Sequence, residues 1–326
     1  MKSLDNVAKI RNLFKGNLQI VAIFVLPLII GVFKPNYLTL INLNNILDLS
    51  SILIISALGF IFVVECGAID LSIEANMALA GVVMAKILQA YPGAGVLAIV
   101  AAILVSAFCG FLNGLIHTKF KIPSFLTTLG MAYISSGICT VVTEGQYVDI
   151  VDLGIREIAI GRLGGSMDAI IPNTLLIACA VAVVIWFLSE KRKHGRYVLA
   201  VGGDELIAKD LGIHVDRVKI ISFAVAGATF GLAGTLLALK LAAGDSFSAV
   251  GYTFETISAC VIGGIAISGG IGKMHKAILG AVIITIIRVG MVFFVVPSNV
   301  QAGILGIIVI LTVAATIDRS KLSIIK

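Results

Sequence analysis

The chain has 326 residues, of which 59% are hydrophobic and only 13% are charged, and its mean hydropathy is +1.10. No soluble core needs that much apolar material, so the composition excludes a soluble globule and predicts an integral membrane protein. The formal net charge is +6. In such a chain this excess indicates membrane topology and contact with anionic lipid, rather than binding to nucleic acid.

Apolar stretches long enough to cross about 30 Å of hydrocarbon as a helix recur along nearly the whole sequence. Their helical period predicts an all-α polytopic transmembrane bundle rather than a β-barrel, in a single membrane-embedded domain covering residues 1–326. About ten spans are expected, at 18–33, 49–66, 71–88, 96–116, 125–142, 170–188, 218–241, 253–271, 277–296 and 300–317.

The distribution of basic residues indicates the orientation of these spans. If residues 1–17 are cytoplasmic and all ten spans form, 18 lysines and arginines fall on the cytoplasmic side and 5 on the outer side, with Arg288 inside a span. The positive-inside rule therefore predicts cytoplasmic N- and C-termini. The first apolar stretch lacks a small-x-small cleavage motif, so we expect an uncleaved anchor.

The main cytoplasmic connection is expected at 189–217, and twelve of the 42 charged residues lie between Glu190 and Lys219. It contains the signals of a short helix over 205–211. These are a preceding Gly202-Gly203 step, an Asp204 N-cap, an i,i+4 pair of Glu205 with Lys209, and Gly212 at the left-handed C′ position.

Three apolar side chains of this short helix, Leu206, Ile207 and Leu211, form a patch too small to be a core. One interpretation is a helix lying on the membrane surface or against its own bundle. The other, which we favour, is a helix that docks a partner. The residues assigned to docking are Gly203, Asp204, Glu205, Leu206, Ile207, Leu211 and Gly212.

Three carboxylates, Glu65, Asp70 and Glu74, interrupt otherwise apolar sequence. Ionisable groups at membrane depth usually face a polar cavity, which predicts a role at a substrate path or gate. The structural interpretation is that Asp70 caps a helix beginning at Leu71. The two interpretations are compatible.

Glycines mark two further regions. Five of them lie between Cys260 and Ala277, where either a broken span beside a path or a close helix crossing with a tight turn would explain them. The pairs Gly110 with Gly114 and Gly227 with Gly231 are typical of closely packed membrane helices.

Catalytic and nucleotide-binding motifs are absent from the sequence. There is no HExxH or GxSxG motif, and the Gly272-Lys273 step lacks the other residues of a P-loop. The five cysteines show no CxxC spacing and are expected to be small buried apolar residues. We therefore expect no enzyme activity, no catalytic residue, no metal site and no cofactor in this chain.

Five segments in a fixed order resemble the permease subunits of bacterial ABC importers for ribose and related sugars, a branch related to branched-chain amino acid permeases. The segments are ECGAIDLS (65–72), KIPSFLTTLG (121–130), GRYVLAVGGDELIAKDLGI (195–213), FETISACVIGGIAISGGIG (254–272) and PSNVQAGILGIIVILTVAATIDR (297–319). The sequence departs from the family pattern at Cys66, at Glu74 and in the basic turn 274–276.

The resemblance implies a multi-pass permease of the bacterial inner membrane, in a homodimer or a pair of similar chains around a central path. Its implied partners are two cytoplasmic ABC ATPase subunits, which hydrolyse the ATP, and an extracytoplasmic substrate-binding protein. The helix after Asp204 would correspond to the family's coupling helix, which fits a groove of the ATPase.

A hydroxylated solute that crosses apolar helices needs replacement hydrogen bonds. The candidates for the substrate path are Asp70, Ser72, Asn76, Asn113, Thr127 and Thr128. The alternative function is an autonomous secondary transporter or facilitator, in which Glu65, Asp70 and Glu74 would form a proton or cation site.

Overall fold

A computed structural model describes residues 19–164 and 171–316, and the predicted cytoplasmic segment 1–17 lies outside these ranges. Each of the ten predicted apolar stretches contains a helix. The helices of these stretches are Gln19–Phe33, α2 (Leu40–Glu65), α3 (Ile73–Ala90), α4 (Gly95–Phe120), α5 (Ser124–Thr143), α7 (Asn173–Trp186), α10 (Val215–Leu241), α11 (Tyr252–Gly263), α12 (Met274–Phe293) and α13 (Ser298–Thr316).

The connections also contain short elements. They are the 3-10 turn η1 (Pro35–Leu38), the strand β1 (Val148–Asp149), α6 (Leu153–Ile160), the π-turn η2 (Phe187–Lys191), α8 (Lys193–Gly203), α9 (Glu205–Asp210) and the strand β2 (Ala243–Gly244). The two strands pair antiparallel, with Val148 opposite Gly244. No pattern in the sequence predicted these strands or α6.

Seven helices in the described part of the chain are long and apolar enough to cross a membrane. They are α2, α3, α4, α5, α7 extended through η2, α10 and α12. The all-α polytopic fold is thus confirmed. Shorter apolar helices at Gln19–Phe33 and Ser298–Ile308 accompany them.

The predicted span 253–271 is wrong in its second half. Helix α11 ends at Gly263, because Gly264 adopts a left-handed conformation with φ of 83° that breaks the helical hydrogen-bond pattern. The amide of Gln19, in the first helix, donates hydrogen bonds to the carbonyl oxygens of Ile262 (3.0 Å) and Gly263 (2.8 Å). A side chain from the other end of the sequence therefore satisfies carbonyl groups that the broken helix leaves open.

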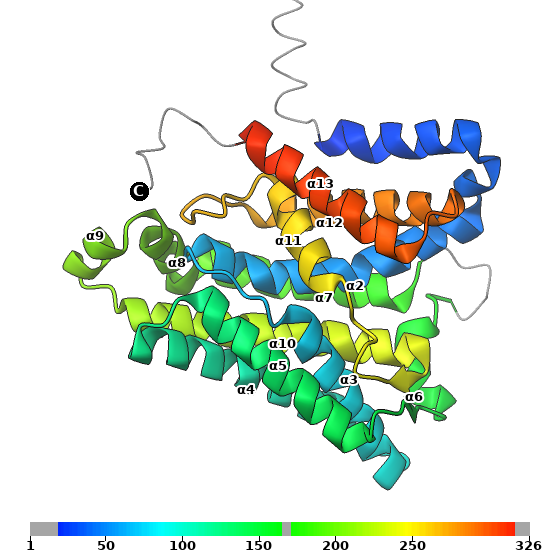
Figure 1. The fold of residues 1–326 in the computed structure, drawn as a ribbon, viewed down its shortest axis with the longest axis horizontal. Helices are drawn as coiled ribbons and strands as arrows, with labels where there is room; N and C mark the ends of the chain where they lie inside the picture. The colour runs from blue at the N-terminus through cyan, green and yellow to red at the C-terminus, as the bar shows by residue number, and fades with distance from the viewer. Residues whose placement is uncertain (1–18, 165–170, 317–326) are drawn as a thin grey trace, which may run out of the picture.

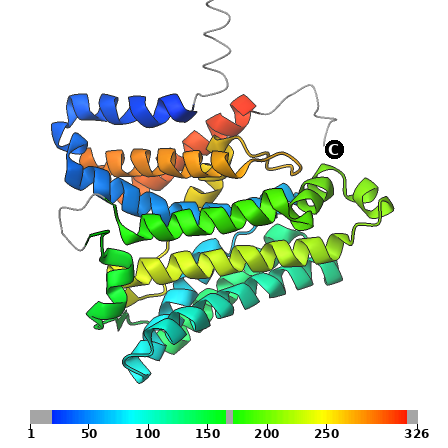
Figure 2. The same cartoon turned by 180° about the vertical axis from the view of Figure 1, so that it is seen from behind.

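Helices α2, α3 and α10 form the centre of the bundle. In their most apolar windows 83%, 67% and 67% of residues are buried, against 33%, 28% and 17% for α4, α5 and α7. Figure 1 shows α5, α11 and α13 on one face, and Figure 2 shows α4, α7 and α10 from behind. The outer helices therefore present wide apolar surfaces around a buried three-helix centre.

The predicted small-residue pairs bring α4 and α10 into backbone contact. A Cβ atom added at Gly110 would lie 2.2 Å from the carbonyl oxygen of Phe223, and one at Gly227 would lie 2.4 Å from that of Ser106. No larger side chain fits this interface without a shift of the backbone. The pairs thus act in helix packing.

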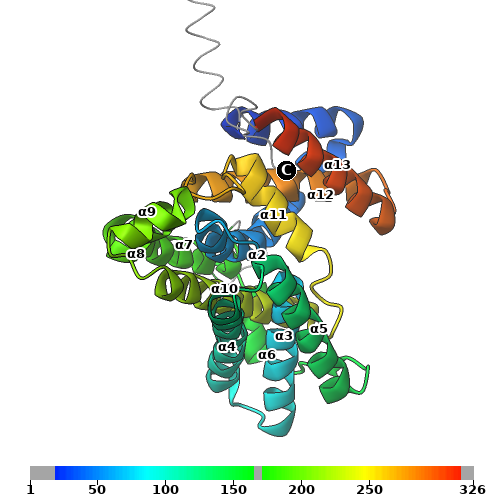
Figure 3. The same ribbon diagram turned by 60° about the vertical axis from the view of Figure 1, so that its left-hand side comes forward.

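The two ends of the bundle carry different connections. Figure 1 shows α8 and α9 at one end and α6 at the opposite end, and Figure 3 shows α8 and α9 projecting from the bundle. The loop after α11 lies at the α8 end, since Gly270 donates a hydrogen bond to the carbonyl oxygen of Glu65 and a Cβ at Gly270 would lie 2.8 Å from the Cα of Gly203.

Candidate functional site

The short helix α9 forms where the sequence predicts it. The Asp204 carboxylate accepts hydrogen bonds from the backbone N–H groups of Leu206 (2.9 Å) and Ile207 (3.0 Å), as an N-cap does. Gly212 ends the turn with φ of 79°. The preceding helix α8 ends at Gly203, as the glycine step predicted.

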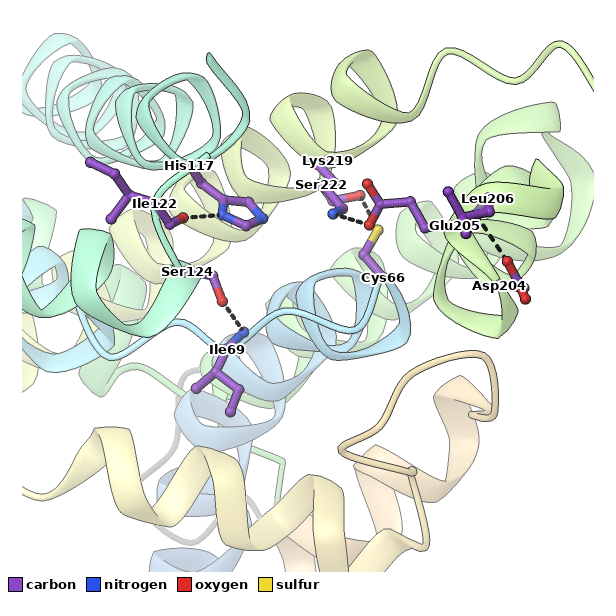
Figure 4. A network of polar contacts seen from close by, with 10 residues as sticks. All are labelled: Cys66, Ile69, His117, Ile122, Ser124, Asp204, Glu205, Leu206, Lys219 and Ser222. Atoms are coloured by element: carbon purple, nitrogen blue, oxygen red, sulfur yellow. Dashed lines mark hydrogen bonds and ion pairs between the residues drawn. The ribbon is translucent and has the colours of Figure 1, made fainter. Parts of the chain in front are cut away.

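The expected pair of Glu205 with Lys209 is replaced by another partner. Lys219, in the first turns of α10, approaches Glu205 to 2.6 Å. Only the turn 211–214 separates α9 from α10, so a side chain of α10 comes close enough to compete with the i,i+4 pair within α9. Figure 4 shows this ion pair, which ties α9 to a transmembrane helix.

The apolar side chains of α9 point away from the bundle. Leu206, Ile207 and Leu211 are 75%, 58% and 75% exposed, whereas Ala208 is buried against the protein. A helix of six residues is far too short to be stable alone in water. The structure therefore holds α9 in place with its cap, Ala208 and the Lys219 ion pair, and leaves three apolar side chains largely exposed.

Close backbone contacts join three segments beside α9. A Cβ atom at Gly202 would lie 1.7 Å from the carbonyl oxygen of Glu65, and one at Gly269 would lie 2.7 Å from the backbone nitrogen of Gly67. Gly270, with φ of 73°, donates its N–H to the Glu65 carbonyl at 3.0 Å. We call this contact of residues 65–67, 202–203 and 269–270 the glycine junction. The structure shows both a helix broken at Gly264 and the close backbone contact with a tight turn, so both explanations for the glycines after α11 stay open.

Most of the predicted substrate-path residues share one hydrogen-bond network. The Ser72 hydroxyl donates to the Asp70 carboxylate (2.6 Å) and accepts from the side-chain amides of Asn76 and Asn113 (both 2.9 Å). Ser135 of α5 extends the network by donating to the Asn76 carbonyl oxygen at 2.9 Å. We call these five residues the Ser72 network. All are fully buried.

The remaining two path candidates lie at the start of α5. The Thr128 hydroxyl accepts the Leu71 N–H at 2.9 Å, while the Thr127 hydroxyl donates a long bond of 3.4 Å to the carbonyl oxygen of Pro123, the N-cap of its own helix. Ser124 likewise accepts the Ile69 N–H at 3.0 Å, which Figure 4 shows. The turn between α2 and α3 is thus hydrogen-bonded to α5 through two hydroxyl groups.

The prediction that Asp70 caps a helix beginning at Leu71 is wrong. Helix α3 begins at Ile73 with Ser72 in the N-cap position, and Asp70 instead accepts the Ser72 N–H at 2.7 Å in a turn before the helix. The short Asp side chain satisfies a backbone group two residues ahead, so the chain turns once more before it becomes helical.

The three carboxylates that interrupt the apolar sequence have separate surroundings. Asp70 binds Ser72, Glu74 accepts the Gly251 N–H at 2.9 Å, and Glu65 lies against Gly272, where a Cβ would come within 2.3 Å of its Oε1. In the described ranges, no three His, Cys, Asp or Glu side chains are placed to hold a metal ion. In the described residues, the three carboxylates therefore bind three different partners.

His194 packs behind the glycine junction. Its ring lies 5.8 Å from that of Phe62, and its Nε2 is 3.4 Å from the Ser222 hydroxyl, which also contacts the Cys66 sulfur at 3.4 Å. Burial lowers the pKa of His194, because the charged imidazolium loses hydration there. The ring is therefore neutral at pH 7.

A basic cleft of about 1020 Å³, which the sequence does not predict, lies beside α9. It lies between the α4–α5 turn and the start of α10, and Lys121, Lys209 and Arg217 are among its lining residues. Residues from distant parts of the sequence meet here, so no local motif marks the cleft.

Comparisons with known proteins fit this arrangement. Residues 42–313 match the family model described as branched-chain amino acid transport system / permease component. The ribose import permease protein RbsC of Escherichia coli (strain K12) is 31% identical over 305 residues, covering 93% of both chains.

Two further relatives come from the same organism. The L-arabinose transport system permease protein AraH is 30% identical, covering 93% of this chain and 90% of the relative. The galactose/methyl galactoside import permease protein MglC is 32% identical, covering 96% and 97%. No solved structure matches the chain.

Proposed function

The chain belongs to the branched-chain amino acid transport system / permease component family, and from this we propose that it is the membrane-spanning permease subunit of an ATP-driven importer for a sugar or similar small polar solute. The observation that carries the proposal is a sugar import permease that is 31% identical over nearly its whole length. The chain is a multi-pass protein of the bacterial inner membrane.

The proposed orientation has ten spans with both termini in the cytoplasm. The distribution of 18 inner and 5 outer basic residues supports it. Cysteines introduced at Gln146 and Lys193, which lie at opposite ends of the bundle, should then react with impermeant thiol reagents from opposite sides of the membrane. Labelling of both from the same side would overturn this topology.

The proposed partners follow from the two ends. Cytoplasmic ABC ATPase subunits hydrolyse ATP and dock on α9, through Leu206, Ile207 and Leu211, which are exposed and apolar. An extracytoplasmic binding protein delivers the solute at the end that carries α6. A second permease chain, most simply another copy, completes the path, and lipid covers the other apolar faces.

A displacement of α9 would be transmitted to the helices of the transport path through a few direct contacts. The glycine junction joins α8 to the turn between α2 and α3, and that turn is bonded to α5 by Ser124 and Thr128. In this mechanism the residues 65–72 carry the displacement from the ATPase to the helices beside the solute. Selective tight binding belongs to the external protein, because a path that held the solute tightly would slow its release.

The test is reconstitution of the permease with its ATPase in liposomes. Loaded binding proteins for different sugars are added one at a time, and ATP hydrolysis and uptake are measured. Stimulation of both by one loaded binding protein is the expected result. Uptake that needs neither ATP nor binding protein would instead establish the secondary transporter.

A further inference from the structure

A groove of about 390 Å³ lies beside the buried Ser72 network, on the face that α5 shares with the loop before α11. Its volume is in the range of small-molecule sites. The residues that line this groove include Glu74, Tyr133, Ser136, Thr140, Ser246 and Phe247.

The α5 side of the groove is polar where a lipid-facing surface would be apolar. Tyr133, Ser136, Gly137 and Thr140 recur at intervals of three and four residues, and therefore share one face of the helix. Tyr133 is 73% exposed. Hydroxyl groups in hydrocarbon are costly, so this face is suited to water or a polar solute.

The opposite side supplies a carboxylate and a free hydroxyl. Glu74 Oε2 accepts the Gly251 N–H at 2.9 Å, and its own backbone N–H is bound by Thr253 at 3.2 Å, which fixes the residue in the first turn of α3. The Ser246 hydroxyl oxygen is buried and has no hydrogen-bond partner in the described part of the chain. A buried hydroxyl without a partner is unfavourable, so this wall of the groove holds a hydrogen-bonding group that the described part of the chain leaves unused.

The Ser72 network lies directly behind this wall. Ser135, next to Ser136 on α5, donates to Asn76 on α3 and so joins the two helices that form the groove. Because the network residues are fully buried, the groove residues are the ones that a solute reaches.

We propose that this groove is a wall of the transport path that contacts the sugar and that favours uncharged or cationic solutes over anionic ones. The proposal rests on the proposed function. The exposed rings of Tyr133 and Phe247 can pack against the apolar face of a sugar ring, while the Ser136 hydroxyl exchanges hydrogen bonds with its hydroxyls. Among the described residues that line the groove there is one carboxylate and no Lys, Arg or His, so an anion would meet only like charge.

Thiol labelling tests the groove without knowledge of the sugar. Ser136→Cys is made in a Cys179→Ser background, since Cys179 is exposed and the other four cysteines are buried. The assembled permease–ATPase complex is treated, with and without ATP, with a cationic trimethylammonium and an anionic sulfonate methanethiosulfonate. Gln146→Cys, in the same background, normalises the intrinsic reactivities.

Ser136→Cys should be labelled in at least one nucleotide state, with the cationic reagent favoured by roughly tenfold after normalisation. Glu74→Gln should reduce this preference towards one. No labelling in either state, while Gln146→Cys reacts, would overturn the proposal, and so would a charge preference that Glu74→Gln leaves unchanged.

A second test fills the groove. A Cβ at Gly137 meets no atom within 4 Å, so Gly137→Phe should fold and should block uptake at least tenfold while the ATPase still co-purifies. Gly303→Phe on α13 is the matched control, because its surroundings are equally open. Wild-type uptake by Gly137→Phe would contradict the proposal. If the wild-type complex shows no binding-protein-dependent uptake, the proposed function fails, whereas the labelling result is independent of that outcome.

Discussion

The Ser72 network and the surface of α9 differ in which side chains they bury and which they expose. In the network, five polar side chains are buried and bond to one another, so their chemistry is directed inward. On α9, three large apolar side chains are exposed and point away from the bundle. A polar residue in a membrane sequence therefore does not by itself indicate a transport path. Likewise, apolar residues in a highly charged connection do not by themselves indicate a buried core. The surroundings decide which is scaffold and which is contact surface.

The strongest test of this contrast is Ile207→Asp. Burying such a side chain in a partner stabilises the complex by about 1.5–3 kcal/mol, and the variant both removes that term and places a charge in the contact. We expect the ATPase to be lost from the purified complex, together with uptake, while membrane insertion stays normal. Co-purification and uptake assays measure both.

The matched control for that variant is Lys193→Asp, which introduces an aspartate at an exposed position of α8. It should retain the ATPase. If Ile207→Asp retains the ATPase and wild-type uptake, α9 is only a surface helix.

Gly202→Ala tests whether the glycine junction couples α9 to the Ser72 network. The added Cβ would lie 1.7 Å from the Glu65 carbonyl oxygen, so the junction must open, at a cost of about 1–3 kcal/mol. We expect a lower melting temperature. We also expect a smaller share of the hydrolysed ATP to drive transport, so more ATP is hydrolysed for each solute molecule imported. Gly203→Ala, one residue further along the same helix with no atom within 4 Å of its Cβ, should behave like wild type. Equal behaviour of the two variants would show that the contact is unimportant.

Asp70 tests whether the network is scaffold alone. Asp70→Ala leaves the Ser72 N–H and hydroxyl without their acceptor and should lower the free energy of unfolding by about 1–3 kcal/mol, which reduces abundance in the membrane. Asp70→Asn keeps an acceptor oxygen and should be close to wild type. Transport per molecule should be unchanged in both. A transport defect in Asp70→Asn at normal abundance would instead place the carboxylate in the path.

The smallest expected effect is the pH dependence caused by His194. Its pKa is lowered in the folded protein, so the unfolded chain binds a proton more readily and acid favours unfolding. The associated stability is complete above the ordinary histidine pKa of about 6.5 and decreases as the pH falls below it. The melting temperature should therefore fall less between pH 7.5 and 5.5 in His194→Gln than in wild type. Identical slopes would contradict this assignment.

Local signals in the sequence predicted the features that depend on local physics. Hydrophobic stretches placed a helix in all ten expected regions, and the Asp204 and Gly212 signals placed α9. These features depend on the hydrophobic effect and on hydrogen bonds within a few residues, so a single sequence specifies them.

The errors have two sources: a distant residue that competes with a local partner, and a choice between two local hydrogen-bond patterns. Lys219 replaced Lys209 as the partner of Glu205, and Asp70 formed a turn rather than a cap. The groove joins α3, α5 and the loop before α11, and no sequence pattern reports that Ser246 and Ser136 line one cavity. Polar residues could be selected as candidates from the sequence, but their burial, which separates the Ser72 network from the groove, depends on tertiary packing.

The hydrogen bonds of Gln19 to the end of α11 also have a consequence for the time course of synthesis. The donor and its first acceptor are 243 residues apart, so at the usual ribosomal rate of about 5–20 residues per second, roughly 12–50 s pass between their synthesis. Throughout that interval the first helix is already made but has no α11 to bind. Its amide can reach these carbonyls only after most of the chain has been translated, so this contact of the helix Gln19–Phe33 closes late in synthesis.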